Sequence, residues 1–171
     1  DLNRLWTQDG LDALVKNNQK NSEEKEQLDL YNLLKEITQT HSGPIYFIDF
    51  HTTSSKTLPF ITVNDALINR KFSQQFPVPI VLGIEEYLKG PLLSYINQLG
   101  YVSLGFESGQ HDEKDAIINC ESLIYLTLFF TKAMERKEEL DFETHYNILK
   151  TQSKSVLDVF EVTYLYRIKP N

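Results

Sequence analysis

The chain has 171 residues, enough for one well-cored domain, and its 41% hydrophobic and 12% aromatic content is that of an ordinary globular protein. It is acidic, with 24 Asp and Glu against 17 Lys and Arg and a formal net charge of −7, and it has no block rich in Lys or Arg. These values argue against a surface that follows nucleic-acid phosphates, so we expect no nucleic-acid partner.

The cysteine count and the apolar runs narrow the class of protein further. The single cysteine, Cys120, excludes an internal disulfide and a cysteine-based zinc cluster, and its apolar surroundings predict a small core residue. No run of about 18 apolar residues is present, so we expect no membrane span. The chain starts at Asp1 without a signal peptide and ends in a strand-like run, from which we expect a cytoplasmic fragment of a longer protein.

Apolar periodicity predicts strands that alternate with helices along most of the chain. The first 21 residues show no clear period. The expected elements, in chain order, are a helix from 22 to a breaker at 41–44, strands at 45–50 and 60–63, a helix to about 72 or 75, a strand at 80–83, a helical piece at 84–88, a helix from 90–91 to 100, a strand at 101–106, helices at 116–133 and about 141–151, and a strand at 156–168.

Polar residues at the helix starts predict the caps of three helices. Ser22 is expected to cap the first helix, because acidic residues follow it in the first turn. Asn64 or Asp65 is expected to cap the second, and Asp112 or Asp115 the long apolar helix.

Strands that alternate with helices imply an α/β fold, with a mostly parallel or mixed sheet and helices on both faces. The last strand follows the last helix that would cover the sheet. We therefore divide the chain into an α/β domain at 1–155 and the start of a further domain at 156–171.

Two polar segments follow predicted strands and hold the first candidate site residues. They are Asp49-Phe50-His51 and the segment 107–111, Glu-Ser-Gly-Gln-His. In open α/β sheets ligands bind at the carboxyl ends of the strands, so both segments should meet at one edge of the sheet.

His51 is the leading candidate for a metal ligand. Imidazole is the commonest protein metal ligand, and Asp49, two residues away on the same strand face, could fix the tautomer of the ring. The alternative is a half-buried histidine bonded to the hydroxyl of Thr52 or Thr53. The other histidines, His41, His111 and His145, are scattered and expected at the surface.

Glu107, Asn3 and Arg4 are the other candidates. Glu107 stands where an apolar strand gives way to a turn, next to Phe106, and a carboxyl desolvated there would have a raised pKa suited to acid–base catalysis. The alternative is an exposed turn glutamate. Asn3 and Arg4 could bind a substrate carboxylate, because a guanidinium matches a carboxylate with two hydrogen bonds, although an arginine near a helix start is usually a surface residue.

Three segments together resemble the succinylglutamate desuccinylase/aspartoacylase family. The segments are Asp1-Leu2-Asn3-Arg4, Asp49-Phe50-His51-Thr52-Thr53 and Glu107-Ser108-Gly109-Gln110, in the order and spacing of that family's D-L-N-R, D-x-H-x-T and E-x-G-Q motifs. The resemblance spans essentially the whole chain. It implies a zinc-carboxypeptidase-like fold, and a final segment, 166–170, that leads into a smaller C-terminal β domain.

The same resemblance implies a role for each candidate in a zinc-dependent amidohydrolase. His51 would be one zinc ligand, and Glu107 would activate the water and then protonate the departing amine. Asn3 and Arg4 would hold the carboxylate of an N-acyl amino acid, the expected small-molecule substrate. A carboxypeptidase-like peptidase is a close variant of this activity.

The chain departs from the family at the other zinc ligands. The family takes them from an H-x-x-E segment before D-L-N-R, and no histidine here has a glutamate three residues on. We expect those ligands upstream of Asp1, because independent domains rarely begin inside a site. The alternative, from another class, is a metal-free and catalytically inactive binding module on the same fold.

Overall fold

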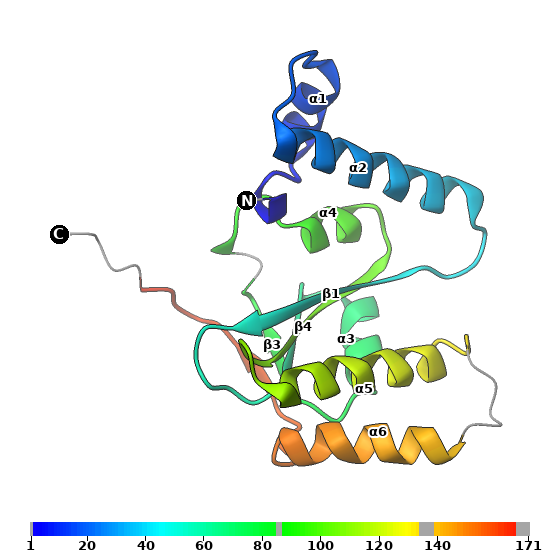
Figure 1. Ribbon diagram of the computed structural model, residues 1–171, viewed down its shortest axis with the longest axis vertical. Coiled ribbons are helices and arrows are strands. Elements are labelled where there is room, and N and C mark those ends of the chain that lie inside the picture. Colours follow the sequence, from blue (N-terminus) through cyan, green and yellow to red (C-terminus); the bar gives the residue numbers. More distant parts are fainter. Residues whose placement is uncertain (1, 85–86, 134–138, 167–171) are drawn as a thin grey trace.

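The computed structural model describes residues 2–84, 87–133 and 139–166 (Figure 1). Its elements are the 3-10 turn η1 (Leu2–Arg4), α1 (Gln8–Lys16), α2 (Ser22–Thr40), β1 (Tyr46–Thr53), β2 (Phe60–Val63), α3 (Leu67–Ser73), β3 (Ile80–Leu82), α4 (Leu92–Gln98), β4 (Val102–Gln110), α5 (Lys114–Phe130), α6 (Glu139–Gln152) and β5 (Val159–Glu161).

The strands form one mixed sheet in the order β1-β4-β2-β3-β5. Three neighbouring pairs are parallel, and β2 runs antiparallel to β4. Helices α1, α2 and α4 lie on one side of the sheet, and α5 and α6 lie on the other (Figure 1). The predicted α/β fold with helices on both faces is confirmed.

Successive side chains of β1 lie on opposite faces of the sheet, so they pack into two separate cores. Tyr46 and Ile48 pack against the larger core, beneath the sheet, which includes Phe106 and Leu123. Phe47, between them, packs on the other side. The smaller core there joins η1, α1, α2 and α4 through Trp6, Leu11, Leu14, Tyr95 and Ile96.

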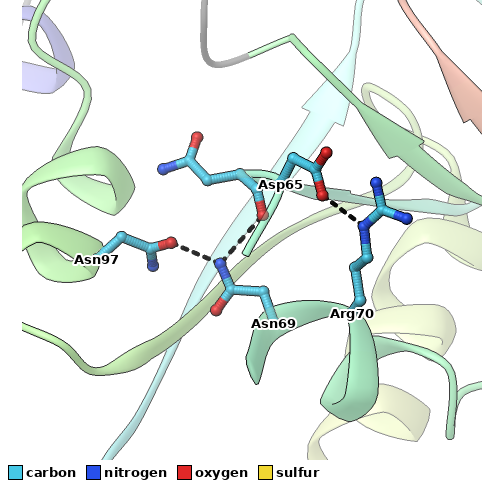
Figure 2. A network of polar contacts seen from close by, with 5 residues as sticks. Asp65, Asn69, Arg70 and Asn97 are labelled. Carbon is cyan, nitrogen blue, oxygen red and sulfur yellow. Dashed lines mark hydrogen bonds and ion pairs between the residues drawn. The ribbon is translucent and has the colours of Figure 1, made fainter. Parts of the chain in front are cut away.

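A buried amide network connects α3 and α4 to β4, and Figure 2 shows the contact between Asn69 and Asn97 within it. Asn69 is fully buried, and its Oδ1 accepts from the Ser103 backbone N–H at 3.0 Å. Its Nδ2 donates to the Asn64 carbonyl at 3.2 Å and to Asn97 Oδ1 at 2.6 Å. Asn97 in turn donates to the Ser103 hydroxyl. Because both amides bond to Ser103 of β4 and also to each other, the network fixes the distance of both helices from the strand.

Helix α1 lies in the part of the chain for which no element was expected. Thr7 caps it by accepting from the Gly10 N–H, and Leu11 and Leu14 are its buried residues. Two buried leucines in nine residues make too short a stripe to stand out as a period. The helix is held by the smaller core, which the sequence pattern does not reveal.

The caps differ from those expected. Asn21, one residue before Ser22, caps α2 and forms a reciprocal capping box with Glu24. Helices α3 and α5 begin at Leu67 and Lys114 with no side-chain cap bond. Asn64 and Asp65 are occupied instead, since Asn64 donates to the Ser94 hydroxyl and Asp65 accepts from Arg70.

The strand expected at 156–168 is shorter in the structure. It forms only at Val159–Glu161, where it pairs with β3 as an edge of the sheet. Residues 167 and 168 lie outside the described part of the chain, as do 85 and 86 within the expected helical piece at 84–88. The division of the chain at 155/156 stays a prediction.

We predict that Gly105→Ala lowers the free energy of unfolding by about 1–3 kcal/mol, because the site is already filled. A Cβ at Gly105 would collide with Thr62 Oγ1 and lie 3.3 Å from Leu93 Cδ1. Urea unfolding measures the loss, and adding Thr62→Ala should recover part of it.

Gly43→Ala is the matched control, because a Cβ there meets nothing within 4 Å. Its effect should stay within about 0.5 kcal/mol. Equal losses at the two glycines would contradict the crowding at Gly105.

Candidate functional site

The pairing of β1 with β4 brings His51 and Glu107 side by side. The two strands are parallel, and His51 is the register partner of Glu107. Since side chains alternate along a strand, Asp49 and His51 share one face of the sheet, and Glu107 extends from that same face of β4. The expectation that the two polar segments meet is confirmed.

The first segment, and the second as far as Gln110, lie inside the paired strands rather than after them. The strands were expected to end at 50 and 106, but β1 runs to Thr53 and β4 to Gln110. The interpretation of Glu107 as a turn residue is therefore wrong. Backbone pairing between the two strands continues through the polar residues and holds them in a fixed register, with an irregularity between His51 and Thr53.

Asp49 and His51 contact each other directly. Oδ2 of Asp49 lies 2.8 Å from Nε2 of His51, and their side chains are 28% and 42% exposed. A carboxylate at this distance fixes the orientation of the ring and favours a proton on Nε2. The hydroxyl of Thr52, which was the alternative partner for His51, lies 2.6 Å from Nδ1 of His111.

Glu107 is a half-buried carboxyl whose pKa is raised. Burial is the main cause, and the nearby Asp49 also raises the pKa, while His51 and His111 lower it. One oxygen, Oε2, is buried and has no hydrogen-bond partner among the described residues. The direction of the shift is the one expected from the sequence, although the cause is burial within the sheet and not a turn beside Phe106.

His111 belongs to this group of side chains, which the sequence did not indicate. It is exposed, as expected, yet close enough to Glu107 to affect its pKa. Its backbone N–H donates to the Thr53 carbonyl at 2.9 Å, which anchors it at the end of the strand pair. His111 could have been predicted as a site residue from its position at the end of the polar segment 107–111.

The contacts of Asn3 and Arg4 lie at the start of α4. Asn3 Oδ1 accepts from the Leu92 backbone N–H at 2.9 Å, and Arg4 Nη1 donates to the Asn3 carbonyl at 2.6 Å. Arg4 also lines a cavity of about 330 Å³ between η1, α1 and α2, together with Gln27. Their role in holding a substrate carboxylate stays a prediction.

The described residues do not by themselves build a zinc site. Among them, no group of three or more His, Cys, Asp or Glu side chains is placed to hold a metal ion. His51, oriented by Asp49, suits a single ligand of the usual kind. Further ligands would have to come from elsewhere.

No helix in the described part of the chain combines the length and the apolar character that a membrane crossing needs.

Sequence comparison gives no relative for this chain. No family model matches the sequence, and no curated protein matches it.

Solved structures match the fold. The ectoine utilization protein EutE (DoeB) from Ruegeria pomeroyi matches in its apo form with a TM-score of 0.56 and in its product-bound form with 0.57, each at 15% identity over 77% of this chain. A succinylglutamate desuccinylase/aspartoacylase from Rhodobacter sphaeroides matches with a TM-score of 0.53, at 15% identity over 77% of this chain.

The matched part covers 41% and 39% of the two EutE chains and 38% of the Rhodobacter chain, so this chain spans about two-fifths of their length. At this identity the likeness concerns the fold. This chain shares the fold of the EutE structures and of the Rhodobacter succinylglutamate desuccinylase/aspartoacylase, as its motifs predicted.

We predict that Glu107→Gln stabilises the protein at neutral pH and loses this advantage in acid. A raised pKa means that the folded state holds the proton more tightly than the unfolded chain does. The stability that this proton gives the folded state is fully present below the ordinary pKa of 4.5 and is lost as the pH rises through the raised pKa of Glu107. Glutamine stays neutral throughout, so the difference from wild type should grow as the pH rises from below 4.5 through the raised pKa of Glu107.

Urea unfolding of both proteins across this pH range measures the difference. Glu121→Gln, at an exposed position of α5, controls for the loss of one negative charge. A difference that does not change with pH would contradict the burial of a proton-binding carboxyl at 107.

Proposed function

We propose that this chain carries part of the active site of a zinc-dependent amidohydrolase that deacylates an N-acyl amino acid. The observation that carries the proposal is the register of His51 with Glu107, which puts an imidazole with a carboxylate partner next to a half-buried carboxyl. The fold shared with the desuccinylase/aspartoacylase structure supports the same reaction class. A cytoplasmic location remains part of the proposal.

Glu107 is the general base and acid of the proposed reaction. A carboxylate takes a proton from the attacking water and later returns it to the departing amine nitrogen. Burial raises the pKa of Glu107, which makes it a stronger base than an exposed glutamate, and Oε2 has no competing partner among the described residues. Both properties suit a group that must bind and release one proton in each cycle.

His51 supplies one metal ligand in this proposal. Because Asp49 contacts Nε2, the ring would turn Nδ1 toward the metal. Zinc, when bound, lowers the pKa of a water molecule and polarises a carbonyl group. The remaining ligands would come from outside the described residues, which contain no three-ligand group.

Asn3 and Arg4 would bind the carboxylate of the substrate, a small molecule. One neighbouring structure is described as product-bound, which is consistent with a small-molecule site on this fold. Asn3 already bonds to the first N–H of α4, so it would also fix the start of that helix beside the site. Activity on N-acyl amino acids but not on peptides with a free C-terminus would distinguish the proposed amidohydrolase from a carboxypeptidase-like peptidase.

A metal-free binding module on the same fold is the second candidate. The absence of a three-ligand group among the described residues favours it. It would keep the pocket and the strand register without turnover, and the zinc content of the full-length protein separates the two candidates.

We predict that His51→Ala lowers the zinc content of the full-length protein, because it removes a ligand. Elemental analysis of purified protein gives the zinc per chain. His41→Ala is the control, since His41 is an exposed histidine at the end of α2. Equal zinc in wild type and His51→Ala would remove His51 from the ligand set, and a wild type without zinc would favour the binding module.

We predict that Glu107→Gln keeps its zinc and loses about 10²–10⁴-fold in the rate of amide hydrolysis, because proton transfer fails. In the wild type kcat/KM should fall in acid, where Glu107 becomes protonated and can no longer accept a proton from the water. Hydrolysis of a panel of N-acyl amino acids measures both effects, with Glu121→Gln as the control. Unchanged activity in Glu107→Gln would refute its role.

A further inference from the structure

A second cavity, of about 380 Å³, lies under the far side of β4. Its walls are the loop 56–59 after β1, the end of β4, the start of α5 and the end of α6. The side chain of Ser108 alternates with that of Glu107 and so extends from the opposite face of the strand. This cavity is therefore distinct from the site of His51 and Glu107.

Asn119 of α5 gives the cavity an unused hydrogen-bond acceptor. Its side chain lines the cavity and is only 2% exposed. Nδ2 donates to the Ser108 carbonyl at 2.9 Å, whereas Oδ1 is buried and has no partner among the described residues. Buried amide oxygens are nearly always hydrogen-bonded, so Oδ1 calls for a donor from within the cavity.

Charged side chains of both signs surround the same cavity. Lys56 and Lys154 are exposed cations on it, and Glu113 and Asp115, at the start of α5, are anions. None of the four forms an ion pair within the described part of the chain. A simple anion would be repelled by the two carboxylates, and a simple cation would be repelled by the two lysines. The lining therefore suits a ligand that carries both charges.

We propose that this cavity binds a small zwitterion of the free amino-acid type. Its ammonium group donates to Asn119 Oδ1 and faces the carboxylates of Glu113 and Asp115, and its carboxylate faces Lys56 and Lys154. The volume is that of a small-molecule site. The proposal needs neither zinc nor catalysis, so it stands apart from the proposed amidohydrolase.

Two hydrogen bonds connect this cavity to β1. Asn119 bonds to the Ser108 carbonyl, and the Ser108 hydroxyl donates to the His51 carbonyl at 3.0 Å. A ligand that engages Oδ1 would polarise the Asn119 amide and the groups bonded to it. Binding should therefore be visible at the Asn119 side-chain amide and at the backbone of Ser108.

The test is an NMR titration of the isotope-labelled chain with L-alanine, L-glutamine and β-alanine. We expect saturable shifts of the Asn119 side-chain amide and the Ser108 backbone at millimolar concentrations. Propionate and ethylammonium, each carrying one half of the alanine zwitterion, should bind at least about tenfold more weakly, because each leaves one set of charges unmatched.

Lys154→Ala and Asn119→Ala should each weaken binding about five- to tenfold, as expected for the loss of one charge-assisted hydrogen bond. Lys150→Ala changes an exposed lysine near the end of α6 that does not line the cavity, and it should leave binding unchanged. Lys154 is exposed, so its variant reports binding even if Asn119→Ala does not fold.

Three outcomes would overturn the proposal. No saturable shift with any of the three zwitterions would mean that water alone satisfies Asn119 Oδ1. Equal binding of propionate or ethylammonium would remove the need for both charges. Equal affinity in Lys154→Ala and Lys150→Ala would place the ligand elsewhere on the protein.

Discussion

The parallel pairing of β1 with β4 holds His51 in register with Glu107 and sets which face of the sheet each side chain of the two strands occupies. β4 is bonded along both of its edges, to β1 and to β2, and both of its faces are covered. A one-residue slip in a strand moves every side chain to the other face, and here it would put Phe106 among the polar groups and Glu107 into the larger core. The hydrophobic packing of Leu104 and Phe106 thus fixes the position of the next residue, Glu107, and of its carboxyl group.

The other face of β4 is built from small and polar residues, and this leaves room above the sheet. Ser103 receives the amide network of Asn69 and Asn97, and Gly105 allows Thr62 to approach the strand closely. Larger residues at these positions would push α4 away from the strand.

The sequence predicted the elements whose stability comes from a continuous apolar pattern and missed features that depend on distant partners. The strands at 60–63 and 80–82 and the long helices have such patterns. The ends of β1 and β4 do not, because His51 and Glu107 stay in the sheet through backbone pairing that any residue type can make. The meeting of these two residues was predictable from the position of polar residues near two strand ends, whereas His111 and Asn119 gain their surroundings only when the chain folds.

The Asp49–His51 contact decides how this site could hold a metal. A carboxylate that accepts from Nε2 fixes the tautomer in which Nδ1 carries the lone pair, so a metal ion would be bound through Nδ1. In the proposed enzyme, the charge of a metal ion held by His51 would favour the ionised form of Glu107. A raised pKa in the metal-free chain and a working base in a metal-loaded enzyme are thus compatible. Burial is the main cause of the raised pKa, to which Asp49 adds, and a cation beside the same carboxyl would favour the ionised base.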